Sequence, residues 1–106
     1  MSEKTKILNL LRKIVCSLFC INEYTQNSIL KESASKFLNE YAKKYQKYLH
    51  ERQGFVIENS TQILDFCNEC YGDENVFDFA EDVEYGLREL IEIINYDGDD
   101  KYSSRN

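Results

Sequence analysis

The chain has 106 residues, with 19 acidic against 13 basic side chains and a net charge of −6. This length allows one hydrophobic core and predicts a single domain over residues 1–106. The negative balance argues against a general nucleic-acid binder, which neutralises phosphates with Lys and Arg, and against anchoring on an anionic membrane. Proline is absent and glycine is scarce, so the turn signals of a sandwich or barrel are missing. We therefore predict an all-α fold, a small antiparallel bundle of about four helices.

The first predicted helix covers residues 3–21. Its apolar side chains recur at i, i+3, i+4 and i+7, the spacing of an amphipathic helix that faces a core. The apolar run 14–21 has no small-residue cleavage site after it and is too short to span a bilayer. We therefore expect a cytoplasmic protein with reduced cysteines. The predicted core positions are Ile7, Leu8, Leu11, Ile14, Val15, Leu18 and Phe19.

The second predicted helix covers residues 33–52, after a polar connection over 22–27. Ser33 is a candidate N-cap, and Gly54 is a candidate stop signal. A stripe of aromatic and aliphatic side chains shares one face of this helix. Its members are Phe37, Leu38, Tyr41, Tyr45, Tyr48 and Leu49.

The third and fourth predicted helices cover residues 60–71 and 79–95. Asn59 or Ser60 can cap the third helix, and Gly72 is the residue type that favours the left-handed conformation after a helix end. Gly86 lies inside the fourth helix, where glycine costs roughly 1 kcal/mol relative to Ala. A close contact with another helix would explain it. Residues 97–106 are predicted to be a flexible tail.

The cysteines form two pairs, Cys16 with Cys20 and Cys67 with Cys70. Each spacing places both thiols on one helix face, so two facing helices would present four thiolates to zinc. Free cysteine also behaves as a small buried hydrophobe, and both pairs lie within apolar stripes. We therefore favour structural cysteines and predict no metal site.

The remaining motifs do not predict catalysis or a cofactor. His50 is the only histidine, and it stands near a predicted helix end, where a cation interacts well with the helix dipole. The Lys- and Tyr-rich stretch 41–48 resembles a single-strand binder, but a solvated lysine face opposite core tyrosines is the simpler interpretation. Residues 97–100 lack the glycine and glutamate that complete a calcium loop. We therefore predict no enzyme, no catalytic residue and no direct nucleic-acid binding.

An acidic cluster between positions 69 and 84 is the sharpest feature of the sequence. Helix N-terminal charges and a soluble loop account for about half of it. The functional interpretation is a phosphate-like surface that fills a basic groove in a partner. Interfaces favour aromatic anchors with polar rims, and Tyr71, Val76 and Phe77 are predicted to be exposed within the cluster. Its acidic members are Glu69, Asp73, Glu74, Asp78, Glu81, Asp82 and Glu84.

Three stretches, 37–41, 63–73 and 82–91, carry a resemblance to a known family. They read FLNEY, ILDFCNECYGD and DVEYGLRELI. Together they resemble the colicin D-like bacterial self-protective immunity proteins, whose relatives serve contact-dependent growth inhibition systems. The resemblance covers residues 33–95 and rests on residue classes. The extra cysteines and Gly86 depart from the family pattern.

This resemblance implies an immunity protein that neutralises a cognate toxin's C-terminal nuclease domain, commonly one that cleaves transfer RNA. Acidic side chains of such proteins occupy the toxin's basic active-site cleft. One alternative is a zinc- or thiol-dependent regulatory module. Another is an inhibitor of a different nucleic-acid enzyme by nucleic-acid mimicry. The expected toxin-binding residues are Glu69, Tyr71, Asp73, Glu74, Phe77, Asp78, Glu81 and Asp82.

Overall fold

The computed structural model describes the backbone of residues 2–51 and 57–103, and the side chains of residues 2–50 and 57–94. Over these ranges the secondary structure is helical, with no strand. The helices are α1 (Glu3–Tyr24), α2 (Ser28–Glu51), α3 (Ser60–Cys70) and α4 (Phe77–Ser103). The predicted small all-α bundle is therefore confirmed.

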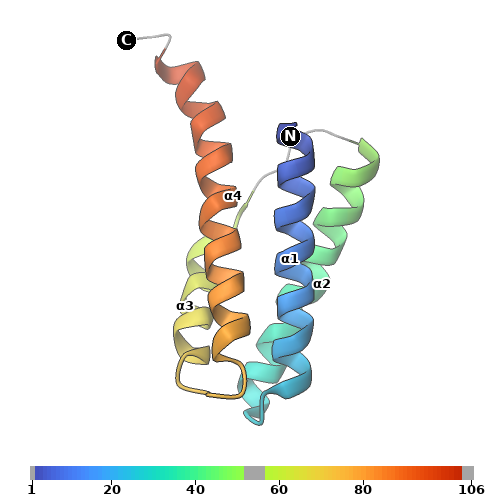
Figure 1. The fold of residues 1–106 in the computed structure, drawn as a ribbon, viewed down its shortest axis with the longest axis vertical. Helices are drawn as coiled ribbons and strands as arrows, with labels where there is room; N and C mark the ends of the chain where they lie inside the picture. Colours follow the sequence, from blue (N-terminus) through green and yellow to red (C-terminus); the bar gives the residue numbers. More distant parts are fainter. Residues whose placement is uncertain (1, 52–56, 104–106) are drawn as a thin grey trace.

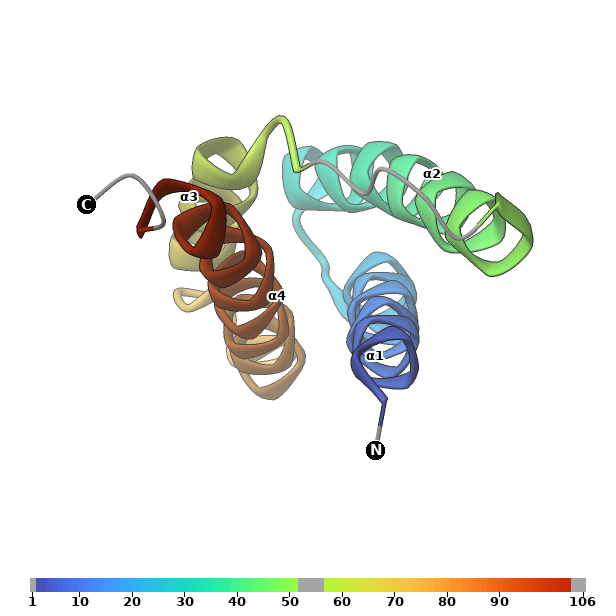
Figure 2. The same ribbon diagram turned by 90° about the horizontal axis from the view of Figure 1, so that it is seen from above.

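The four helices alternate in direction and surround one core (Figure 1). Neighbouring pairs around the bundle are α1–α2, α2–α3, α3–α4 and α4–α1. Seen from above, α1 and α3 lie on opposite corners (Figure 2). The α1–α2 and α3–α4 connections lie at the same end of the bundle, which we call the loop end (Figure 1).

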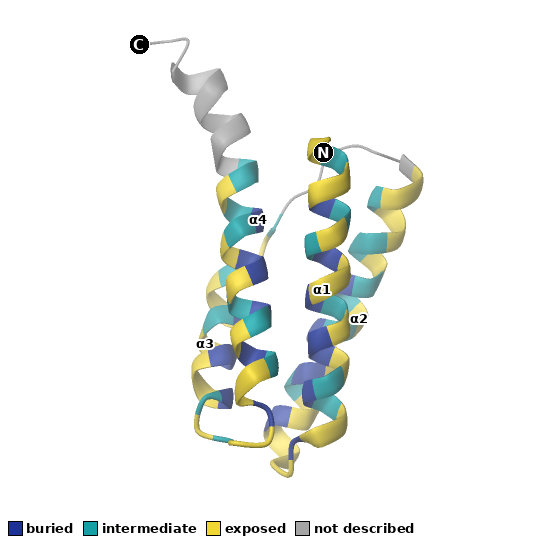
Figure 3. Cartoon of the chain, viewed as in Figure 1, coloured by how far each residue is buried: buried dark blue, intermediate teal, exposed yellow. Residues whose placement is uncertain are grey.

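The core consists of the inward stripes of all four helices. Figure 3, coloured by burial, shows buried and exposed positions alternating along each helix in the described part of the chain. Phe37 of α2 meets Phe66 of α3 edge to face, with ring centroids 5.4 Å apart. The predicted stripes are largely correct. Phe19, however, was predicted in the core and is 52% exposed. It lies at the margin of its stripe, where a 3.6-residue period begins to turn outward.

Gly86 marks a close approach of α1 and α4. A Cβ atom built there would lie 3.2 Å from Cγ1 of Ile14, which is fully buried. The helix contact predicted from this glycine is confirmed. Such a separation is too short for an ordinary side-chain contact, so glycine allows the two helices to pack closely.

The helix boundaries differ from the predicted ones. Asn27 rather than Ser33 caps α2, because its Oδ1 accepts hydrogen bonds from the backbone N–H groups of Ile29 and Leu30 at 2.9 and 3.1 Å. Asn is a preferred N-cap, and the predicted connection ended at this residue. The stop predicted at Gly54 lies outside the described residues.

The connection after α3 also differs from the prediction. The backbone of Tyr71, at the end of α3, has a right-handed helical conformation. Gly72 does not adopt the positive φ that we expected there. Helix α4 begins at Phe77, two residues before the predicted start. It continues to Ser103, so the tail predicted from residue 97 is helical as far as that residue. Once a helix has nucleated, each added residue gains a hydrogen bond, so polar composition alone does not end it.

Candidate protein-binding surface

Asp73 organises the short connection between α3 and α4. Its backbone N–H donates to the carbonyl of Cys70 at 2.9 Å, and its own carbonyl accepts from Val76 at 3.1 Å. Its side-chain Oδ1 accepts from the backbone N–H of Asn75 at 3.0 Å. These bonds satisfy groups that a helix end leaves without partners and fix the path of the loop.

The same carboxylate joins the two connections of the loop end. Thr25, between α1 and α2, donates its hydroxyl to Oδ2 of Asp73 at 2.7 Å. This hydrogen bond is the main cause that lowers the pKa of Asp73, with the Asn75 N–H contributing next. Beside it, the ring of Tyr24 stacks on Phe79 at a centroid distance of 5.8 Å. The loop end is therefore one continuous surface built from both halves of the chain.

Four of the predicted carboxylates point into solvent without internal partners. Within the described part of the chain, Glu69, Glu74, Asp78 and Glu81 are exposed and form no hydrogen bond or ion pair. They belong to the end of α3, the loop and the first turns of α4. Unpaired carboxylates that stay hydrated are available to make charge-assisted hydrogen bonds with Lys or Arg of another molecule.

The other predicted residues have contacts within the chain. Asp82 lies 4.0 Å from Nζ of Lys13, with both side chains about half exposed. Tyr71 donates its hydroxyl to Glu84 at 2.5 Å, and Arg88 donates Nε to the other Glu84 oxygen at 2.9 Å. The Tyr71 hydrogen bond is the main cause that lowers the pKa of Glu84. Glu84 therefore serves the fold rather than the outer face.

Aromatic side chains complete the surface, though not all of the expected ones. Phe77 is 41% exposed and packs against the ring of Tyr71 at 5.1 Å, as an exposed anchor would. Val76 was predicted to be exposed and is fully buried. Its position immediately before α4 turns it into the core, so the loop places adjacent residues on opposite sides.

Tyr85 is an exposed aromatic that sequence reasoning missed. It is 62% exposed, and Nζ of Lys13 lies 5.6 Å from its ring centroid. Asp78, Glu81 and Tyr85 follow i, i+3, i+7 spacing, which puts them on one helix face. The signal was available, because this register is opposite the apolar positions Val83 and Leu87, which are fully buried.

The cysteine pairs do not converge. Cys16 is exposed and Cys20 is half-buried on α1, whereas Cys67 and Cys70 are buried on α3. Because α1 and α3 occupy opposite corners, the facing arrangement that a four-thiolate zinc site needs is not present. In the described side chains, no three His, Cys, Asp or Glu residues gather to hold a metal ion.

Comparison of the chain with protein-family models, curated proteins and solved structures found no match. None of the helices, as far as they are described, is both long and apolar enough to cross a bilayer.

Proposed function

We propose that this chain is an immunity-type protein that binds a cognate bacterial nuclease toxin in the cytoplasm and blocks its basic active-site cleft. The toxin would be one that cleaves transfer RNA, in keeping with the resemblance drawn from the sequence. The protein acts by binding and performs no catalysis of its own. The binding surface is the loop end together with the first turns of α4.

One observation carries this proposal: the exposed carboxylates Glu69, Glu74, Asp78 and Glu81, which have no hydrogen bond or ion pair in the described structure, belong to the same end of α3, loop and first turns of α4 as the exposed ring of Phe77. A surface of this kind matches the usual anatomy of an interface, with an aromatic anchor inside a polar rim. Opposite a cationic cleft, the carboxylates take the positions of substrate phosphates. Complementary fields also accelerate association and select the partner.

Hydrogen bonds of the loop end support the proposal in a second way. The Thr25–Asp73 bond and the Tyr24–Phe79 stack hold both connections in place without the partner. A surface that is ordered before binding loses less conformational freedom on association, which favours affinity.

Co-expression with the toxin encoded next to this gene tests the function directly. The protein should restore growth and co-purify with the toxin's C-terminal nuclease domain. A chain that neither rescues growth nor co-purifies would contradict the proposal. Inhibition of a different nucleic-acid enzyme, with no effect on the neighbouring toxin, would favour nucleic-acid mimicry instead.

A charge-reversal pair tests the surface. Asp78→Lys with Glu81→Lys should weaken binding at least about tenfold, equivalent to about 1.4 kcal/mol, in a titration of purified proteins. The matched control is Glu58→Lys with Glu92→Lys, which changes the net charge equally at exposed sites outside the proposed surface. Circular dichroism checks that both variants are folded. Equal weakening by the two pairs would reject the loop end as the binding surface.

A further inference from the structure

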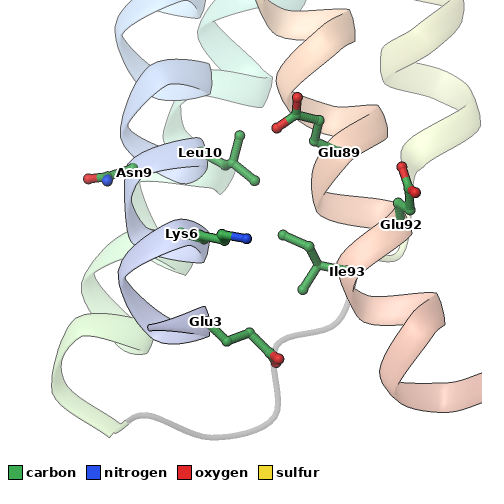
Figure 4. Close-up of a pocket in the computed structure, with 7 residues that line it drawn as sticks. All are labelled: Glu3, Lys6, Asn9, Leu10, Glu89, Glu92 and Ile93. Carbon is green, nitrogen blue, oxygen red and sulfur yellow. The ribbon is translucent and has the colours of Figure 1, made fainter. Parts of the chain in front are cut away.

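Helices α1 and α4 form a groove in the half of the bundle away from the loop end. They pack closely at Gly86, and toward the N-terminus of α1 the two ribbons separate (Figure 1). A hollow of about 760 Å³ lies between them there. Lys6 and Leu10 point from α1 toward α4, and Ile93 points back (Figure 4).

The floor of this groove is apolar. Leu10 and Ile93 pack against the core but are only partly buried. A partner that covers the groove would bury the rest of both side chains, and burial of apolar surface is favourable by roughly 25 cal/mol per Å². The groove is thus an unfilled continuation of the core between two helices.

The rim of the groove is acidic. Glu89 and Glu92 of α4 and Glu3 of α1 line it, against one cation, Lys6. In the described structure, Glu89 and Glu92 have no hydrogen bond or ion pair. An occupant that fits must therefore bring apolar side chains for the floor and positive charges for the α4 side.

From this geometry we infer that the α1–α4 groove is a second docking site, which takes a basic amphipathic helix of a partner protein. Amphipathic helices commonly bind by laying their apolar face into a groove between helices, with charged residues at its edges. Ile93 lies sixteen residues beyond Phe77 on α4, roughly 24 Å along the axis. The groove is therefore separate from the loop end, and the inference does not depend on the proposed function.

Titration of the isotope-labelled protein with a synthetic Leu–Lys amphipathic helix of about 18 residues tests this inference by nuclear magnetic resonance. We expect saturable shifts at Leu10, Glu89 and Ile93. Two control peptides separate the contribution of charge from that of apolar contact. One replaces each Lys by Glu, and the other replaces each Leu by Ser. Both should bind at least about tenfold more weakly.

Variants of the protein complete the experiment. Glu89→Lys with Glu92→Lys should weaken the peptide at least about tenfold, whereas Asp78→Lys with Glu81→Lys should change its affinity less than about twofold. Shifts confined to the loop end, or equal binding of the Leu-to-Ser peptide, would overturn the inference. These readouts use no toxin, so their failure is distinct from failure of the proposed function.

Discussion

Asp73 has two roles that the sequence could not separate. It was predicted to face a partner, and in the structure it is half-buried. It also accepts hydrogen bonds from Thr25 and Asn75, which close the loop end. Both of these donors favour the ionised carboxylate, so they hold the pKa of Asp73 below its usual range.

Replacement of Asp73 by Asn should make the stability of the protein less dependent on pH. Because the folded state lowers this pKa, the stabilisation is present above the unfolded pKa of about 4 and is lost as the pH falls through the folded value. The free-energy difference between wild type and Asp73→Asn should therefore be larger at pH 7 than at pH 3 in urea titrations. Asp65→Asn is the control, since Asp65 is exposed without a hydrogen bond. A difference that is independent of pH would contradict this role.

At the scale of single residues, the sequence predicted which residue types gather in this region. It predicted less well whether each side chain points into the core or into solvent. The acidic cluster was evident, and four of its members have no hydrogen bond or ion pair in the described structure. Val76 and Phe77 are neighbours and both apolar, yet Val76 is fully buried and Phe77 is 41% exposed. Only the path of the loop decides between them, and that path depends on Thr25, which lies 48 residues from Asp73. No local pattern contains this information.

At the scale of the helices, hydrophobic periodicity was sufficient to find each element. All four helices were located because their apolar stripes are long and regular. The ends were less accurate, since caps are single residues in competition with nearby alternatives. Asn27 and Ser33 are both good N-cap residues, and the choice depends on which one the α1–α2 turn presents. Gly86 was the exception to this uncertainty. A glycine inside a helix is unfavourable, so its presence indicated a close contact with another helix.

Gly86→Ala should destabilise the protein by about 1 kcal/mol, although alanine is the better helix former. The gain in helix propensity is at most about 1 kcal/mol, whereas overpacking of a core costs about 1–3 kcal/mol. Ile14 is fully buried and has little room to move away from the new methyl group. Urea unfolding measures the change.

Gly72→Ala is the matched control for this substitution. A Cβ atom there would make an ordinary contact at 3.5 Å with the carbonyl of Glu69, and the backbone does not need glycine. We expect no loss of stability, and a gain of up to about 1 kcal/mol from reduced freedom of the unfolded chain. A larger loss at Gly72 than at Gly86 would refute the packing argument.

At the scale of the whole molecule, the bundle divides the cysteines by environment. Burial raises the pKa of Cys67 and of Cys70 to about 12, with nearby charges adding to the effect. Cys16 lies on the outer face of α1. The order of helices around the core thus leaves the pair on α1 accessible to solvent and buries the pair on α3.

Thiol labelling at pH 8 should therefore be biphasic. Cys16 should react fastest and Cys20 next, whereas Cys67 and Cys70 have raised pKa values, hold little thiolate and need the core to open. The variant Cys16→Ser with Cys20→Ser should show only the slow phase of labelling. In urea this slow phase should disappear, because unfolding exposes all thiols. Fast labelling of that variant without urea would show that α3 is not enclosed as described.

The bond between Thr25 and Asp73 has a consequence for the timing of recognition. Its two ends come from the two halves of the chain, so neither the α1–α2 hairpin nor the α3–α4 hairpin alone holds the complete surface. A chain still emerging from the ribosome, with only the α1–α2 hairpin made, offers only a fragment of it. A partner that binds the proposed surface would therefore engage folded molecules in preference to single hairpins.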